Sequence, residues 1–140
     1  MLFPKKVKHR KWQTGRENIR KQDRPETRGI SVAFGEFGLK ATSSKRIRSN
    51  QIESARRTLS RHLGKVGRYW IRIFPDRPFT QKPAQVKMGK GKGDLQGYEV
   101  PVYPGRILFE IDGVPEDIAR EALRKAGTKL PVTTKVITRL

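Results

Sequence analysis

The sequence predicts an α+β fold, in which two helices pack on a mixed or antiparallel β-sheet within a single compact domain. Two segments have apolar residues at helical spacing, and short β-rich segments lie before, between and after them. The chain has 140 residues, enough for one modest core but too few for two ordinary domains. We therefore expect a basic N-terminal arm at residues 1–29 and a body at residues 30–140 that includes a long loop at 75–97.

The arm has no apolar periodicity, and its ten Lys and Arg residues outnumber its acids, Glu17, Asp23 and Glu26. Such a composition is typical of a disordered, solvated tail or of an extension that becomes ordered on RNA. Trp12 can be a plain exposed side chain or can stack on a base. Given the charge of the rest of the chain, we favour an arm that orders on binding.

The body opens with alternating apolar residues from Ile30 to Phe34, and the alternation resumes at Phe37 and Leu39. This period of two predicts the first strand. The interruption at Gly35 indicates a bulge or a tight bend within it.

Residues 50–66 are predicted to form the first helix, because their apolar residues recur at spacings of three and four. Asn50, with Glu53 three residues later, resembles a capping box at the start of this helix. Gly64 or Gly67 can end it. The residues of the expected apolar stripe are Ile52, Ala55, Leu59, Leu63 and Val66.

A β-rich run from Tyr69 to Phe74 predicts a buried strand. Its aromatic residues are a conceivable stacking platform for single-stranded RNA. We favour core packing for Trp70, because Ile71 and Ile73 continue the same apolar run.

The segment from Pro75 to Gly97 has no periodic pattern, and loops of this length inside compact domains are usually functional or disordered. It contains the run Met88-Gly89-Lys90-Gly91-Lys92-Gly93. Glycine permits close backbone approach to a surface, and lysine adds mobile positive charge. The phosphate backbone of a nucleic acid is the commonest partner that needs both, with a plain flexible hairpin tip as the alternative.

The second half of the body is predicted to contain strands at residues 98–103 and 107–111, with Pro104-Gly105 as the turn between them. A second helix begins at about Pro115, a residue that suits the first helical turn, and ends at Gly127. A last strand covers residues 133–138. The apolar face of the second helix consists of Ile118, Ala122, Leu123 and Ala126.

The charge of the chain indicates its class of partner. The chain has 32 Lys plus Arg against 13 Asp plus Glu, a net charge of +19, and a pI of about 11.0. This is the electrostatic character of a nucleic-acid binder. An anionic membrane is the rival polyanion, but we find no apolar run long enough to span one and no long amphipathic helix to lie on one. The N-terminus also lacks the apolar region of a secretory signal.

The residue patterns of the sequence do not favour a catalytic site or a metal site. Gly91-Lys92 is not part of a Walker A motif, because Gly93-Asp94 stands where that motif continues with Ser or Thr into a helix. The absence of cysteine excludes disulfides and thiol catalysis, and fits a reducing cytoplasm or an equivalent organellar matrix. His9 and His62 have no metal-ligand spacing, and the scattered acids are expected to form solvated ion pairs rather than a two-metal site.

Six motifs occur in order along the chain: Met1-Leu2-Phe3-Pro4-Lys5, Phe34-Gly35-Glu36-Phe37-Gly38-Leu39-Lys40, Gln51-Ile52-Glu53-Ser54-Ala55-Arg56-Arg57, Trp70-Ile71-Arg72-Ile73-Phe74-Pro75-Asp76, Met88 to Gly93, and Asp112-Gly113-Val114-Pro115-Glu116. Together they closely resemble the bacterial large-subunit ribosomal protein L-sixteen family over the whole chain.

The resemblance implies a non-enzymatic structural constituent of the large ribosomal subunit, with an α/β-hammerhead-like fold and no cofactor. The implied partners are large-subunit (23S) ribosomal RNA, A- and P-site transfer RNA near the peptidyl transferase region, and neighbouring ribosomal proteins. Neither a membrane nor a second copy of the chain is expected. A free-standing basic RNA-binding or ribosome-assembly protein is the alternative, and an RNA-cleaving enzyme is a third hypothesis.

The resemblance also implies which residues contact RNA. The loop facing transfer RNA would comprise Lys87, Met88, Gly89, Lys90, Gly91, Lys92 and Gly93. The residues expected on ribosomal RNA, from the arm and the first helix, are Lys5, Lys6, Lys8, Arg10, Lys11, Trp12, Arg16, Arg56, Arg57 and Arg61. Two features depart from the family pattern: residues 17–29 lengthen the arm, and Lys87 stands where arginine is common.

Overall fold

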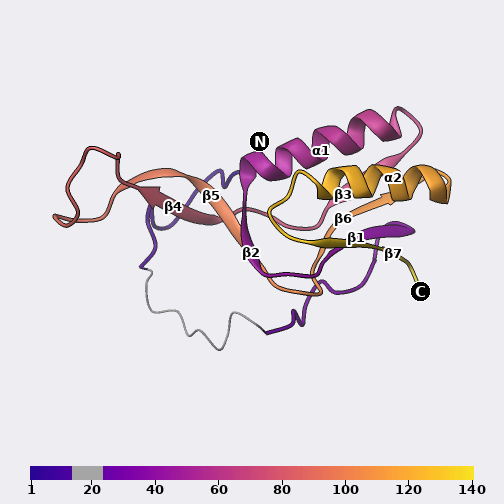
Figure 1. The fold of residues 1–140 in the computed structure, drawn as a ribbon, viewed down its shortest axis with the longest axis horizontal. Helices are drawn as coiled ribbons and strands as arrows, with labels where there is room; N and C mark the ends of the chain where they lie inside the picture. Colours follow the sequence, from indigo (N-terminus) through magenta and orange to yellow (C-terminus); the bar gives the residue numbers. More distant parts are fainter. Residues whose placement is uncertain (14–23) are drawn as a thin grey trace.

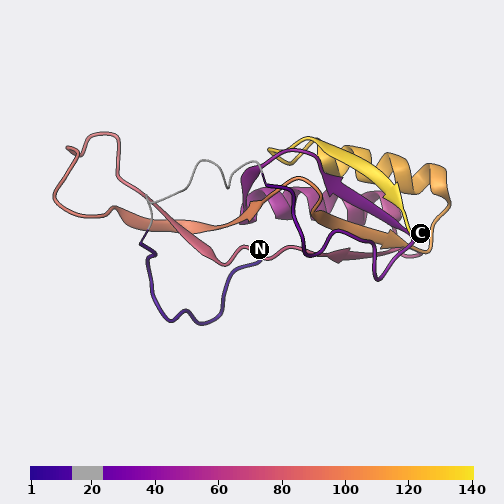
Figure 2. The same cartoon turned by 90° about the horizontal axis from the view of Figure 1, so that it is seen from below.

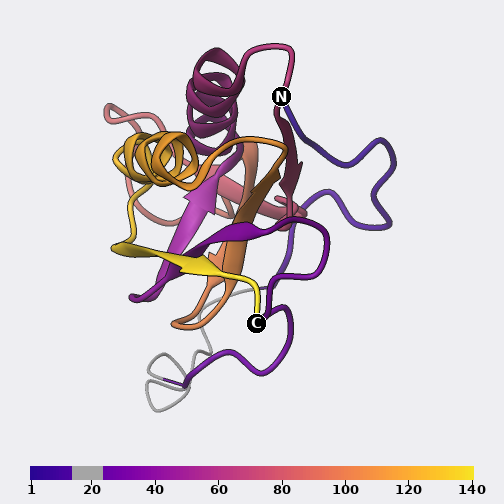
Figure 3. The same ribbon diagram turned by 90° about the vertical axis from the view of Figure 1, so that its right-hand side faces the viewer.

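The computed structural model describes residues 1–13 and 24–140, and it confirms the α+β class (Figure 1). Two helices lie side by side over one face of a four-stranded antiparallel sheet, as the end-on view in Figure 3 shows. The strand order in this sheet is β3-β6-β1-β7. The elements are α1 (Ser49–Leu63), α2 (Glu116–Gly127), β1 (Phe37–Ala41), β3 (Arg68–Ile71), β6 (Ile107–Asp112) and β7 (Thr134–Thr138).

A second, three-stranded antiparallel sheet has the order β2-β5-β4, with β2 at Lys45–Arg48, β4 at Arg77–Gln81 and β5 at Asp94–Val102. Strands β4 and β5 form a ribbon that projects from the body, at the end opposite the C-terminus (Figures 1 and 2). The expectation of an irregular loop over residues 75–97 is therefore wrong, because β4 and the first four residues of β5 lie within it. Only residues 82–93 form the irregular tip. We call the two strands and this tip the ribbon.

The buried face of α1 confirms four of the five residues in the expected stripe, Ile52, Ala55, Leu59 and Leu63. Val66 is the exception, since its side chain is 79% exposed. The helix ends before Val66 because Gly64 adopts φ +62°, a conformation that glycine reaches without strain.

The start of α1 also differs from the expected capping box. Arg48 is the N-cap residue, and its backbone N–H donates a hydrogen bond to Oε1 of Gln51 (2.9 Å). Asn50 is already inside the helix. Glu53 instead binds the two arginines that follow it on the same helix.

The first strand is shorter than the apolar alternation predicts. Ile30 and Phe34 are 48% and 57% exposed, and pairing begins only at Phe37. The bend predicted at Gly35 is present. A Cβ at Gly35 would lie 2.5 Å from the backbone O of Ile111, so only glycine allows this approach to β6.

The aromatic run after α1 is only partly buried. Strand β3 ends at Ile71, earlier than expected, and Phe74 is 46% exposed. Tyr69 packs against the core. Trp70 is half-buried, and its ring stacks on Phe34 with the centroids 6.1 Å apart.

In the second half, the turn at Pro104-Gly105 links two different sheets, because β5 pairs with β2 and β4 while β6 pairs with β1 and β3. Pro115 is the N-cap of α2. Ile118, expected on the apolar face, is 42% exposed, and Ala119 is buried in its place. Strand β7 confirms the last strand that was predicted, at residues 133–138. No helix in the described residues is long and apolar enough to cross a membrane.

Candidate nucleic-acid interface

The tip of the ribbon presents its basic residues to solvent. Lys87, Lys90 and Lys92 are exposed, and Met88 is 92% exposed. Three consecutive residues have positive φ: Gly89 (+94°), Lys90 (+59°) and Gly91 (+102°). A Cβ at either glycine would meet nothing within 4 Å. The glycines are therefore required for the backbone conformation, and the space around them is open to a partner.

The neck of the tip is held more tightly than its end. A Cβ at Gly93 would lie 2.8 Å from the backbone C of Gln81, so the two sides of the hairpin approach each other where only glycine fits. Lys82 donates a hydrogen bond from Nζ to the carbonyl of Gly89. Sequence reasoning missed this role of Lys82, because its only signal is a basic residue at the end of an unrecognised strand.

The structure brings the arm and the tip together. Lys92 donates a hydrogen bond from Nζ to the carbonyl of Trp12, whose side chain is 43% exposed. The other described basic residues of the arm lie on the surface: Lys5, Lys6, Lys8 and Arg10 are exposed, and Lys11 is half-buried. Arg16 lies outside the described residues, as do Glu17 and Asp23.

The end of the arm contacts the body. The N–H of Glu26 donates to the carbonyl of Pro104 (2.8 Å), and the N–H of Ile107 donates to the carbonyl of Gly29 (2.8 Å). The guanidinium of Arg106 lies 3.9 Å from the carboxylate of Glu26. These contacts hold residues 26–29 beside the turn that joins the two sheets.

The three arginines of α1 that are expected to contact RNA differ in their hydrogen bonds and in their exposure to solvent. Arg56 donates hydrogen bonds to both carboxylate oxygens of Glu53 (2.5 and 3.0 Å) and to the hydroxyl of Tyr69 (3.1 Å). These bonds raise the pKa of Arg56 and, against the effect of burial, lower that of Glu53 to about 2. Arg57 approaches Glu53 at 3.3 Å but is 71% exposed, and Arg61 is exposed. Arg57 and Arg61 are therefore the residues of this set with exposed charge.

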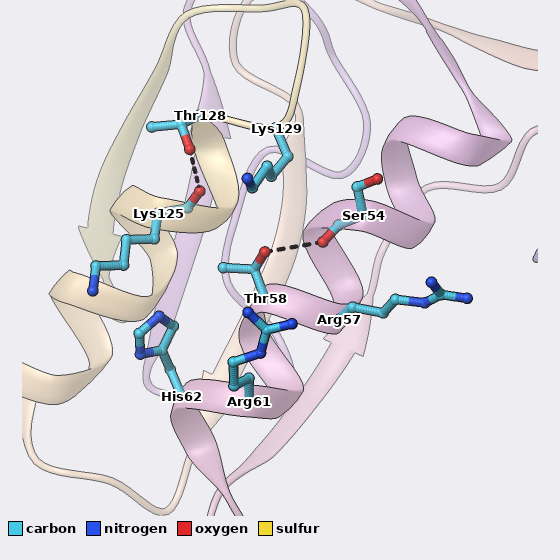
Figure 4. A pocket seen from close by; sticks show the side chains of 8 residues that line it. All are labelled: Ser54, Arg57, Thr58, Arg61, His62, Lys125, Thr128 and Lys129. Atoms are coloured by element: carbon cyan, nitrogen blue, oxygen red, sulfur yellow. Dashed lines mark hydrogen bonds between the residues drawn. The ribbon is translucent and has the colours of Figure 1, made fainter.

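A basic groove of about 400 Å³ lies between α1 and α2 (Figure 4). We call it the interhelical groove. Arg61, His62 and Lys129 extend into the space between the helices, whereas Arg57 points away from α2. Sequence reasoning missed Lys125 and Lys129, because nothing in the sequence shows that the end of α2 packs beside α1. The lining residues are Ser54, Arg57, Thr58, Arg61, His62, Lys125, Thr128 and Lys129.

These surfaces can bind anions through lysine and arginine, with exposed aromatic and apolar side chains beside them. In the described part of the chain, no three His, Asp or Glu residues gather in a way that would hold a metal ion. The chemistry that the arrangement supports is recognition of a polyanion.

Comparison with known proteins identifies the family. The family model described as ribosomal protein L16p/L10e matches residues 4–137. Proteins named large ribosomal subunit protein uL16 are similar over nearly the full length. The relative from Parabacteroides distasonis is 53% identical over 99% of this chain and 93% of its own. Those from Xanthomonas campestris pv. campestris (strain B100) and a Polaromonas species are 51% and 52% identical, over 99% and 100% of this chain and 98% of their own.

The relatives are named as ribosomal proteins and not as enzymes. The match to the family model and the identity of at least 51% both extend over nearly the whole chain. The chain therefore belongs to the ribosomal protein L16p/L10e family.

Proposed function

We propose that the chain is a structural constituent of the large subunit of cytoplasmic ribosomes, where it binds ribosomal RNA and contacts A- and P-site transfer RNA near the peptidyl transferase region. In this role it supports translation and subunit assembly. The names of the relatives support the place in the large subunit. The observation that carries the transfer-RNA contact is the projecting ribbon with its exposed lysines.

The ribbon suits a contact made at a distance from the body. A five-residue strand such as β4 spans about 16 Å, and the tip extends further. Lysines are compact charges on flexible stems, so Lys90 and Lys92 can follow phosphates without demanding one geometry. Because phosphate contacts carry no sequence information, the same tip can serve every transfer RNA.

The arm and the body supply the proposed contacts with ribosomal RNA. Lys5, Lys6, Lys8 and Arg10 of the arm are exposed. The arm meets the tip at Trp12, which is exposed enough to stack on a base. Neutralisation of phosphates releases condensed counterions, so affinity for ribosomal RNA should fall steeply as salt rises.

The order-on-binding hypothesis predicts that residues 1–13 are mobile in the isolated protein, and NMR relaxation that finds them rigid without RNA would overturn it.

The test of the transfer-RNA contact uses large subunits reconstituted with a variant chain. Lys90→Ala with Lys92→Ala should leave incorporation intact and slow transfer-RNA accommodation. The control, Lys65→Ala with Lys135→Ala, removes two exposed lysines of the body and the same amount of charge. Equal accommodation rates for both double variants would reject the assignment of the tip.

The competing function is that of a free-standing RNA-binding or ribosome-assembly protein. Sedimentation of the native protein separates the two. A structural constituent remains with mature large subunits in stoichiometric amount, whereas an assembly factor is found with precursors and is absent from mature subunits.

A further inference from the structure

We propose that the interhelical groove binds a ribose-phosphate segment of single-stranded RNA and distinguishes it from DNA through the 2′-hydroxyl group. The inference rests on the proposed function only in taking RNA as the partner. It extends the contact already expected through Arg57 and Arg61 of α1 to a groove that α1 shares with α2, and it adds a reason for preferring RNA.

The first observation is the charge in the groove. Within the described residues, neither Arg61 nor Lys129 forms an ion pair. Lys125 pairs with Glu121 at 3.1 Å, on the exposed surface of α2. Two cations without a carboxylate therefore face the same space between the helices (Figure 4). A phosphate is the counter-charge that such a pair fits.

The second observation concerns the two threonine hydroxyls of the groove. Oγ1 of Thr58 donates to the carbonyl of Ser54 (3.0 Å), and Oγ1 of Thr128 donates to the carbonyl of Lys125 (2.5 Å). A hydroxyl has a single proton, so both oxygens retain only acceptor lone pairs. While they keep these hydrogen bonds, they cannot donate to a phosphate, which is itself an acceptor. They can accept the proton of a 2′-hydroxyl, which RNA has and DNA lacks.

The size of the groove limits what it can hold. Its volume of about 400 Å³ is near the lower end of the range for small-molecule sites, about 300–1,000 Å³. It suits a short stretch of single strand and is too small for a duplex. Cationic donors and acceptor oxygens thus line the same space. In it, the phosphates of one nucleotide segment can contact the cations while its 2′-hydroxyl contacts the threonine oxygens.

The experiment compares the full chain binding to fluorescent octauridylate and to its 2′-deoxy counterpart, which differ only in the 2′-hydroxyls. The wild type should prefer the RNA. Thr58→Val with Thr128→Val keeps the side-chain shape and removes both oxygens, and should reduce the preference about threefold to tenfold per lost hydrogen bond. Thr58→Ser with Thr128→Ser should retain it. Thr138→Val, on the exposed end of β7, is the matched control. An unchanged ratio in the double valine variant would overturn the proposal.

The phosphate contact has its own variant. Arg61→Gln with Lys129→Gln should weaken binding to both oligonucleotides and reduce the salt dependence by about 1.4 in the logarithmic slope, the value for two phosphates of a single strand. Lys135→Gln is the control for removal of a surface charge. A slope equal to that of the wild type would overturn this part.

A measurement on the wild type avoids dependence on variants that fold poorly. In an NMR titration with octauridylate, the amides of residues 54–62 and 125–129 should shift, and a spectrum without shifts there would reject the groove. Failure of the groove would leave association with large subunits intact. Failure of the proposed function would instead appear as loss of that association while the preference for RNA persists.

Discussion

Arg72 and Glu110 form an ion pair in which Nη1 lies 2.6 Å from Oε2 of a fully buried carboxylate. The other oxygen, Oε1, accepts the backbone N–H groups of Ala33 (2.6 Å) and Phe34 (3.1 Å). Burial alone would raise the pKa of Glu110, but the bonds from Arg72, Phe34 and Ala33 together lower it below its ordinary value. The carboxylate thus fastens the segment before β1 to the sheet.

The variant Glu110→Gln should lower the free energy of unfolding by about 3 kcal/mol, because it leaves the guanidinium of Arg72 without its buried counter-charge. Urea denaturation measures the change. Glu116→Gln is the control, since Glu116 pairs with Arg120 at 2.9 Å on the exposed face of α2. A solvent-exposed pair of this kind contributes about 0.5 kcal/mol or less. Equal losses in both variants would contradict a special role for the buried pair.

Acid should destabilise the protein partly through Glu53. Its pKa is lowered from 4.5 to about 2 in the folded state, chiefly by the hydrogen bond from Arg56. A group with a depressed folded pKa stabilises the fold above its unfolded pKa and loses this contribution as the pH falls through the folded value. The free energy of unfolding should therefore drop between pH 4.5 and about 2, and drop less in Glu53→Gln.

Urea denaturation at several pH values across that window measures the difference. Asp76→Asn, which removes an exposed carboxyl group far along the chain from Glu53, serves as the control. Identical acid losses in the wild type and in Glu53→Gln would contradict the coupling to Arg56.

Leu59 and Val66 stand in one apolar stripe by sequence spacing, but the structure separates them. Leu59 is fully buried and Val66 is 79% exposed. Leu59→Ala should lower the free energy of unfolding by about 3 kcal/mol, through lost burial and the cavity that remains. Val66→Ala should change it by less than about 0.5 kcal/mol. Thermal or urea unfolding measures both changes. Equal losses of unfolding free energy in the two variants would mean that α1 continues through Gly64 in solution.

The pair also shows what the sequence could and could not predict about the fold. The period of α1 predicted its buried residues, because a helix on a sheet must bury one face. Where the helix stops depends on which of two glycines takes the left-handed conformation, and Gly64 does so. The alternation from Ile30 to Phe34 misled for a different reason. That segment docks through Glu110, which lies 76 residues from Phe34, rather than by strand pairing.

The ribbon and the groove were less predictable than the core. Among the described residues, no residue of β4 belongs to the hydrophobic core cluster, and Pro78 is the one buried residue of the strand, so the strand carries no apolar alternation to reveal it. The Gly-Lys composition identifies the tip in the sequence. Its contact with Trp12 could not be predicted in this way, because it joins residues 80 positions apart. The groove needs α1 and α2 to lie side by side, and only the assembled fold brings Arg61 to Lys129.

The stiffness of the ribbon should depend on Gly97. The ring of Phe79 covers this glycine, its cross-strand partner, and a Cβ there would lie 2.9 Å from the ring. The guanidinium of Arg48 lies 4.6 Å from the ring centroid and ties β4 to the start of α1. Gly97→Val should displace the ring, at a cost of about 0.5–1 kcal/mol from the lost cation–π contact alone. Amide hydrogen exchange should then accelerate in β4 and β5 and stay unchanged in β1 and β6.

The control is Gln96→Val, at an exposed neighbour in β5, which should leave the exchange rates of both sheets unchanged. Exchange that rises equally in both sheets in Gly97→Val would show general destabilisation instead. Because a loosened ribbon no longer holds its tip at a fixed distance from the body, Gly97→Val should also slow transfer-RNA accommodation.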